Sequence, residues 1–502
     1  MLTMKLRTIP SWASCVALIV SVLNVHQARG QGLNNLWMGG YDSEAGLPFG
    51  GTDLQFQTGT LSIAYVIRGI DFKRTAATIT DTSGNLLFST NGSYIANMTG
   101  DTMLNGTGLN PSNYTSLYPE GLYIPQAVLI LPKPGAPGIY YLFHGTIDDQ
   151  GGPNALYLYL TTIDMNLDGG LGGVTVKNQI LISDALNNGK ITAVKHANGR
   201  DWWVLCHKLN SSTYYKLLVT PDGAGSVTTQ NIGVVRPPDG GQVCFSPDGS
   251  KFAYYWGEQD LDIFDFDRCT GLFSNPVHID INDQNAIGGV AFSPNSHLLY
   301  VPSLNDVYQF DVTAPDIAAS MIHIAEWDSF YSPSPPFATL FDIAQLAPDG
   351  KIYIGTGNST FRLHVINYPD LPGLACDIVQ HGVTLPTYFI DSCPNHPNYH
   401  LGQLPGSPCD TLGLGVPERP PPLNLSAYPN PSSGSFALSY AAQSTVGELV
   451  VRDLCGRVVL QERIPQWSTL HDVALIHAAG GLYQCTMRWG KRTAASRIIV
   501  TP

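Results

Sequence analysis

Residues 243–255 read VCFSPDGSKFAYY, in which two runs of β-forming residues flank the turn Ser246-Pro247-Asp248-Gly249. Proline presets the backbone torsion at the second position of the turn, and Asp and Gly tolerate the reversal that follows. The segment therefore predicts a β-hairpin.

The same unit recurs twice further along the chain. Residues 290–301 contain the turn Ser293-Pro294-Asn295-Ser296, and residues 344–354 contain Ala347-Pro348-Asp349-Gly350. The prolines of the three turns are 47 and 54 residues apart. A single Pro-Asp-Gly turn fits a hairpin in any β-sandwich, but a repeat of about 50 residues is typical of the four-stranded blades of a β-propeller.

Other signals extend this pattern over most of the chain. A third β-run follows the first two hairpins at residues 261–266 and 306–311, and more diverged turns occur at 82–85 and 221–223. From about residue 33 to residue 410 short β-rich runs alternate with turns, without a long helical period. We expect an all-β fold, a β-propeller of about seven blades, followed by a small C-terminal antiparallel β-sandwich.

Composition excludes one class of partner. Charged residues make up 13% of the chain and the formal net charge is −13, so there is no basic field to neutralise phosphates. Nucleic acid is not expected to bind.

The first 30 residues have the pattern of a signal peptide. Lys5 and Arg7 precede an apolar run, and Ala28-Arg29-Gly30 supplies small residues before Gln31. No transmembrane segment is expected elsewhere. Removing residues 1–30 leaves eight cysteines in a chain bound for an oxidising compartment, so disulfides are expected although their pairing is not given by counting.

The prolines between Gly413 and Pro422 mark a linker. We predict four segments: a signal peptide (1–30), the propeller (31–412), the linker (413–422) and the sandwich (423–502).

The last 80 residues resemble the type A C-terminal sorting domain of the type IX secretion system. Four motifs carry the resemblance, at residues 428–436, 450–459, 480–483 and 490–500. The residues matched to these motifs are Tyr428, Pro429, Asn430, Pro431, Gly434, Phe436, Asp453, Gly456, Gly481, Tyr483, Gly490 and Lys491. Read without the family, the same residues describe strands and turns of an immunoglobulin-like accessory module.

The resemblance implies an export label. The type IX secretion machinery would be a partner, the label would be cut near its start, and the passenger would be secreted or held on the outer cell surface after passing the periplasm. Cys455 departs from the family pattern, and with Cys485 it implies a possible disulfide that typical members lack.

The passenger resembles large surface proteins of Bacteroidetes that carry WD-repeat-like propellers. Residues 79–92, 158–173 and 193–203 carry this resemblance. It implies architecture and location only.

Two patterns raise the question of a metal. Asp164, Asn166 and Asp168 match the start of a calcium loop, but Thr175 stands where the bidentate Glu belongs, and a polar hairpin explains the residues equally. Cys393, His396, His400 and Cys409 have spacing that suits zinc, whereas oxidation to disulfides suits the compartment. We therefore predict no metal site and no cofactor.

No catalytic residues are predicted. His144 lies near Asp148, and His196 near Asp201, which is the minimum for acid–base chemistry. The first hypothesis is a binding module that recognises an extracellular glycan or protein, and the alternative is a secreted enzyme degrading polysaccharides or lactones from its central channel. Candidate binding residues are the loop aromatics Tyr114, Tyr118, Tyr123, Trp327, Phe330 and Tyr331.

Overall fold

The computed structural model describes residues 32–56, 61–148, 154–283, 285, 287–410, 423–475 and 478–501. The predicted signal peptide (1–30) and linker (413–422) lie outside the described residues.

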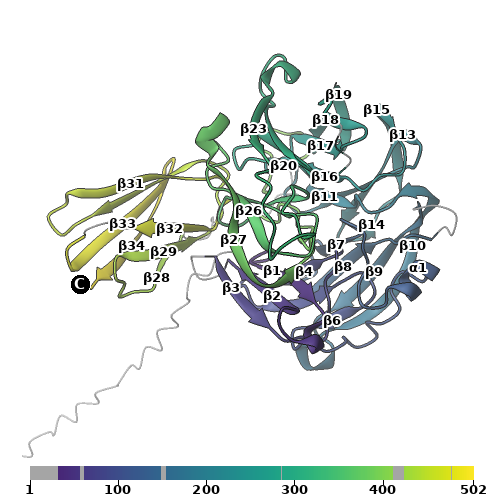
Figure 1. The fold of residues 1–502 in the computed structure, drawn as a ribbon, viewed down its shortest axis with the longest axis horizontal. Helices are drawn as coiled ribbons and strands as arrows, with labels where there is room; N and C mark the ends of the chain where they lie inside the picture. Colours follow the sequence, from purple (N-terminus) through teal and green to yellow (C-terminus); the bar gives the residue numbers. More distant parts are fainter. Residues whose placement is uncertain are drawn as a thin grey trace, which may run out of the picture.

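Seven antiparallel sheets form the larger part of the molecule (Figure 1). In chain order their strands are β1–β3 (Leu36–Tyr41, Gly50–Gln55, Ser62–Val66); β4–β6 (Ala77–Thr80, Leu86–Thr90, Ile95–Asn97); β7–β10 (Val128–Pro132, Ile139–His144, Asn154–Asp164, Gly173–Asn187); β11–β15 (Thr192–Lys195, Trp202–His207, Ser211–Thr220, Gly223–Ala224, Thr228–Arg236); β16–β19 (Gln242–Phe245, Lys251–Trp256, Asp260–Asp267, Leu272–Ile279); β20–β23 (Ala291–Phe292, Leu298–Ser303, Asp306–Asp311, Ile322–Glu326); and β24–β27 (Ala344–Leu346, Ile352–Ile354, Thr360–Ile366, Ile378–Phe389). The fold is the predicted β-propeller, with seven sheets as its blades.

In the part of the chain that the structure describes, helices are few and short. They are η1 (Ser43–Ala45), α1 (Asn113–Leu117), η2 (Asp168–Gly170), η3 (Ala318–Ser320) and η4 (Gly373–Cys376).

The repeated turns lie where the repeat predicts. The three Pro turns join β16 to β17, β20 to β21 and β24 to β25, and residues 82–85 join β4 to β5. The turn at 221–223 differs, because it joins β13 to the short β14. It therefore follows a third strand and does not join the first two strands of its blade.

The inner strands of the blades start at a common end of the channel. The side chain of Gln242, at the start of β16, accepts hydrogen bonds from the backbone of Val290 (2.9 Å) and Ala344 (3.0 Å), which precede or begin β20 and β24. Gln126, just before β7, bonds the backbone of Val243 in the same way (2.8 and 2.9 Å). We call this the upper end, and the end carrying the Pro turns the lower end.

The first blade is closed by the end of the propeller chain. β1 runs opposite to β4, since Gly40 faces Phe72 while Leu36 faces Thr78. Among the described residues of this blade, no assigned strand runs downward beside the channel. Residues 391–402, which we call the closing segment, run down the channel there, with Ser392 bonded to Lys73 at the upper end and Tyr399 to Ile130 lower down.

The C-terminal domain is a sandwich of two antiparallel sheets, ordered β28-β29-β32 and β31-β30-β33-β34. Its strands are β28 (Leu425–Tyr428), β29 (Ser435–Tyr440), β30 (Gly447–Arg452), β31 (Val458–Ile464), β32 (Leu470–Ala474), β33 (Gly481–Trp489) and β34 (Arg492–Val500). Buried residues alternate with exposed ones along β33 and β34, as expected when one face of each sheet packs on a core.

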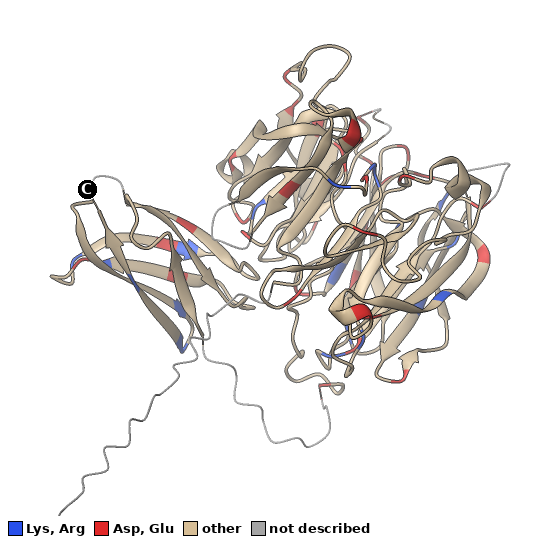
Figure 2. Cartoon of the chain, turned by 90° about the horizontal axis from the view of Figure 1, so that it is seen from below, with Lys and Arg blue, Asp and Glu red and all other residues tan. Residues whose placement is uncertain are grey.

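Charged residues are sparse and scattered over both domains (Figure 2). Within the described residues, no helix is both long and apolar enough to span a bilayer.

Candidate functional site

The central channel is filled by the chain's own amide side chains. Asn395 of the closing segment donates to the carbonyls of Val128 (2.9 Å) and Ile191 (2.7 Å), and Gln126 donates to Asn395 Oδ1 (3.3 Å). Together with Gln242 these amides satisfy backbone groups that face the channel. The cavity left between the inner strands has a volume of about 70 Å³, far below the several hundred Å³ of a typical ligand pocket.

A buried pair of carboxylates seals the upper mouth. Arg74 Nη2 donates to Asp342 and, at 2.9 Å, to Asp391. Burial, together with the nearby Asp391, raises the pKa of Asp342 well above its usual range. Paired carboxylates at a channel mouth would favour the enzymatic alternative. However, the two side chains are 3% and 0% exposed, so they have little access to a ligand in solution.

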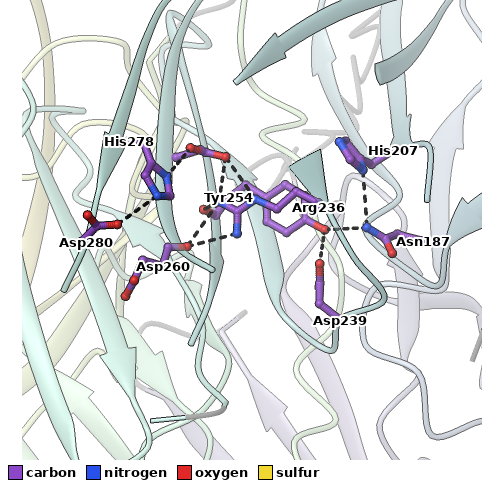
Figure 3. A network of polar contacts seen from close by, with 9 residues as sticks. Asn187, His207, Arg236, Asp239, Tyr254, Asp260, His278 and Asp280 are labelled. Atoms are coloured by element: carbon purple, nitrogen blue, oxygen red, sulfur yellow. Dashed lines mark hydrogen bonds and ion pairs between the residues drawn. The ribbon is translucent and has the colours of Figure 1, made fainter. Parts of the chain in front are cut away.

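A polar network joins three consecutive sheets, since it includes Asn187 of β10, Arg236 of β15 and Tyr254 of β17 (Figure 3). Lys190 Nζ lies 2.6 Å from Asp239 Oδ1, and Tyr254 donates to the other oxygen of Asp239 (2.6 Å). The Arg236 guanidinium lies over the Tyr254 ring and bonds Asp262 (2.7 Å).

The outer end of this network reaches the surface. Asp262 bonds His278 (2.9 Å), whose other ring nitrogen contacts the exposed Asp280 (3.1 Å). The inner groups are buried and paired with one another. Because an unpaired charge at such depth would destabilise the fold, we assign these groups a structural role.

Three tyrosines form a cluster in the segment between β6 and β7, which contains α1, on the upper face. Tyr114 packs on Tyr118 with ring centroids 4.7 Å apart, and Tyr118 packs edge-on against Tyr123 at 5.2 Å. Tyr118 and Tyr123 are 38% and 39% exposed. Burial raises the pKa of Tyr114 to about 12. This tyrosine cluster therefore presents preorganised, half-exposed rings beside the upper mouth.

Carboxylates lie close to the tyrosine cluster. Oxygens of Asp42, Asp71 and Glu120 lie within 4.8 Å of one another. Lys73 Nζ contacts Asp42 (3.1 Å) and Asp71 (3.7 Å) and lies 4.1 Å from the centre of the Tyr41 ring. Burial raises the pKa of Asp71 to about 6. The lysine supplies positive charge within this acidic group.

The other predicted aromatics lie in the loop between β23 and β24. Trp327 packs on Tyr331 (5.5 Å), and Phe330 stacks on His381 (4.2 Å). Phe330 is 36% exposed. Five of the six aromatics named from the sequence thus lie in loops that precede inner strands, and Tyr114 lies in the short helix α1.

Several residues of the weak metal candidates form bonds within the protein. Asp164 Oδ1 accepts from both the backbone and the side-chain amide of Asn166 (2.8 Å each), which closes the hairpin that contains Asp168. Of the zinc candidates, Cys409 forms a disulfide, and His396 bonds the carbonyl of Thr78 (2.9 Å).

The histidine candidates are structural. His144 lies between Asn110 and Thr161 (2.8 Å each), and burial lowers its pKa to about 3. His196 bonds the carbonyl of Cys269 (3.1 Å).

The disulfide differs from the suggested one. Cys269 pairs with Cys409 across 140 residues, with Cα atoms 5.4 Å apart, whereas Cys455 and Cys485 are free. Cys485 points into the sandwich core from β33, while Cys455 is exposed in the turn after β30. The suggested Cys455–Cys485 bridge is therefore not formed.

The sorting-motif residues shape the sandwich. The Asn430 side chain donates to Arg497 O (2.8 Å) and accepts from Ile499 N (2.9 Å), which ties the entry of the domain to β34. Phe436 and Tyr483 belong to the core, and Gly434 bonds Leu475.

Other motif residues form turns or the surface. Asp453 accepts from the backbone of Cys455 and Arg457 in the β30–β31 turn, and Gly456 there has a positive φ of 79°. Gly490 turns β33 into β34, and Lys491 beside it is exposed. Tyr428, Pro429, Pro431 and Gly481 are also exposed.

Sequence reasoning missed the amides that fill the channel. Gln126, Gln242 and Asn395 are isolated polar residues in β-rich or proline-rich stretches. The only signal for their role was the residue type. An amide side chain both donates and accepts hydrogen bonds, so it can bond the edges of two strands.

Comparison with known proteins identifies the tail. Residues 426–501 match the family described as "Secretion system C-terminal sorting domain". No curated protein matches the chain.

Solved structures resemble the chain only distantly. A "putative 6-phosphogluconolactonase" from Bacteroides fragilis is 12% identical with a TM-score of 0.39, covering 71% of this chain and 95% of its own. A second protein with that description, from Bacteroides uniformis, is 14% identical with a TM-score of 0.37, covering 80% and 96%. A functionally unknown protein from Desulfotomaculum acetoxidans is 13% identical with a TM-score of 0.36, covering 72% and 99%.

The motif residues and the family match both indicate a secretion sorting signal. The chain carries a type IX secretion C-terminal sorting domain, which directs its β-propeller to the cell surface or the medium.

Proposed function

We propose that this protein is an exported binding module whose propeller recognises an extracellular glycan through the tyrosine cluster on its upper face. The observation that carries the proposal is the filled channel. Because the cavity between the inner strands has a volume of only about 70 Å³, this observation favours binding on the loops over binding in the channel. A rigid ring of blades that carries variable loops suits recognition.

The chemistry of the upper loops favours a sugar. Half-exposed tyrosines offer an apolar ring face and a hydroxyl group at little cost in side-chain entropy. Asp42 and Glu120 add acceptors for hydroxyl donors next to these rings. Together they match a neutral ligand that has both C–H faces and hydroxyl groups.

The test combines a glycan array with a hydrolysis screen, using the chain from Gln31 onward. We expect binding without turnover. The double variant Tyr118→Ala/Tyr123→Ala should lose about tenfold or more in affinity, as truncation of central aromatic contacts does.

Tyr368→Ala is the matched control, because this tyrosine is 59% exposed in the loop after β26, at the lower end. It should bind as the unchanged chain does. Cleavage of any glycan would instead favour the alternative, a secreted polysaccharide- or lactone-degrading enzyme. Equal loss in both variants, or binding only to proteins, would refute the assignment.

A further inference from the structure

The lower end of the propeller is in contact with the sorting domain. The contact is made by residues 465–469, the loop between β31 and β32, which we call the docking loop. Thr469 N donates to the carbonyl of Pro348 (2.8 Å), in the Pro turn between β24 and β25. Its hydroxyl group approaches the same oxygen at 3.4 Å.

Trp467 lies at the centre of the docking loop. Its ring packs against the apolar cluster that includes Phe252 of β17 and Leu401 of the closing segment. A small cavity of about 90 Å³ is lined by Trp467 and by propeller residues such as Pro348 and His400. An aromatic side chain of the sorting domain therefore covers the place where the closing segment leaves the channel.

The backbone around Trp467 is arranged for this contact. Trp467 has a φ of +60°, a conformation that is unfavourable for a bulky residue and that occurs where surrounding contacts enforce it. Its amide donates to Gln443 O (2.8 Å) in the neighbouring loop of the sandwich.

A glycine of the propeller permits the close approach. Gly350, with φ +79°, lies so close to Pro465 that an added Cβ would be 3.0 Å from its ring atoms. Thr469 is 2% exposed. The two surfaces thus fit at backbone level.

We propose that the lower end of the propeller is a docking surface for the chain's own sorting domain, which masks the exit of the channel until the two parts separate. The occupant is the docking loop, seated by Trp467 and by the hydrogen bond from Thr469 to Pro348. Beside the docking loop, a cleft of about 530 Å³ lined by Arg268, His400, Ala442 and others separates the two domains. The docking loop therefore makes a local contact. Separation of the tail exposes Leu401 and Pro348. These residues belong to a second surface, in addition to the tyrosine cluster, that is covered in the full chain.

The test measures amide hydrogen exchange of the full chain. In the unchanged chain the Thr469 amide should exchange slowly, and in Trp467→Ala it should exchange about tenfold faster or more, because local opening frees the bond to Pro348. Leu454→Ala is the matched control: this side chain is 76% exposed at the β30–β31 turn, and its removal should leave the exchange unchanged.

A second variant approaches the contact from the propeller. Gly350→Asn keeps a residue type that tolerates positive φ and places a Cβ against Pro465, so it should free Thr469 to the same extent and lengthen the molecule in small-angle scattering. Fast exchange of Thr469 in the unchanged chain would overturn the proposal. So would slow exchange in both Trp467→Ala and Gly350→Asn.

Discussion

The propeller and the sorting domain are both built from antiparallel sheets, but their interiors differ. The propeller buries amides, ion pairs and histidines, among them Asn395 and the Lys190–Asp239 pair. The buried cluster of the sandwich is apolar, with Leu449, Met487 and Trp489 as members. A ring of blades leaves backbone groups facing its channel, and polar side chains have to satisfy them, whereas two packed sheets bury only side-chain faces.

The largest expected effect is at the upper mouth. Arg74→Ala leaves Asp342 and Asp391 buried without their shared cation, so unfolding of the propeller in denaturant should become easier by about 3–5 kcal/mol. Lys208→Ala removes a half-exposed pair with Asp184 and should cost no more than about 1 kcal/mol. Equal decreases in the free energy of unfolding for the two variants would mean that the buried ion pair does not stabilise the propeller.

Acid should affect the propeller through its neutral histidines. Burial lowers the pKa of His144 to about 3, while in the unfolded chain it is near 6.5. The unfolded state therefore binds the proton first, so this contribution is complete above pH 6.5 and is lost as pH falls toward 3. At pH 5 the loss is about 2 kcal/mol.

The variant His144→Gln isolates this contribution. The difference in unfolding free energy between the unchanged chain and the variant should shrink by about 2 kcal/mol between pH 7 and pH 5. A difference independent of pH would show that His144 is not a neutral buried group. Unfolding of the sandwich serves as the internal reference.

The smallest effect is expected in the sorting domain. Asn430→Ala removes two hydrogen bonds between the domain entry and β34, at a cost of about 1 kcal/mol in the unfolding transition of the sandwich. Ser433→Ala, an exposed neighbour, should change it by less than about 0.5 kcal/mol. A loss above about 3 kcal/mol would show that the sandwich, too, depends on polar contacts.

The sequence predicted the parts of the fold that local chemistry specifies. Turns such as 246–249 gave the blades because their residues set the backbone torsions, and the tail was recognised from motifs such as Tyr428–Phe436. The six aromatics were named from the sequence as loop or edge residues, without a face of the propeller being assigned to them.

The parts that depend on distant contacts were not predictable. The closing segment resembles a proline-rich loop, and its role depends on strands more than 200 residues earlier, such as β7 and β11. The Cys269–Cys409 bridge joins residues 140 positions apart, whereas the sequence suggested Cys455 and Cys485 because they are the only two cysteines of the last domain. Alternation along β33 turns Cys485 inward, away from Cys455, which the spacing of the two residues does not show.

The order of synthesis makes the closing segment the last step of assembly. Residues 33–41 are synthesised before any other part of the propeller sheets, yet the blade that they begin gains its inner neighbour only when residues 391–402 are present. A chain that stops before residue 391 can form blades but no closed ring. Because contacts so distant in sequence form late and slowly, the polypeptide has a long interval, before the ring shuts, in which it can still be threaded through a narrow pore.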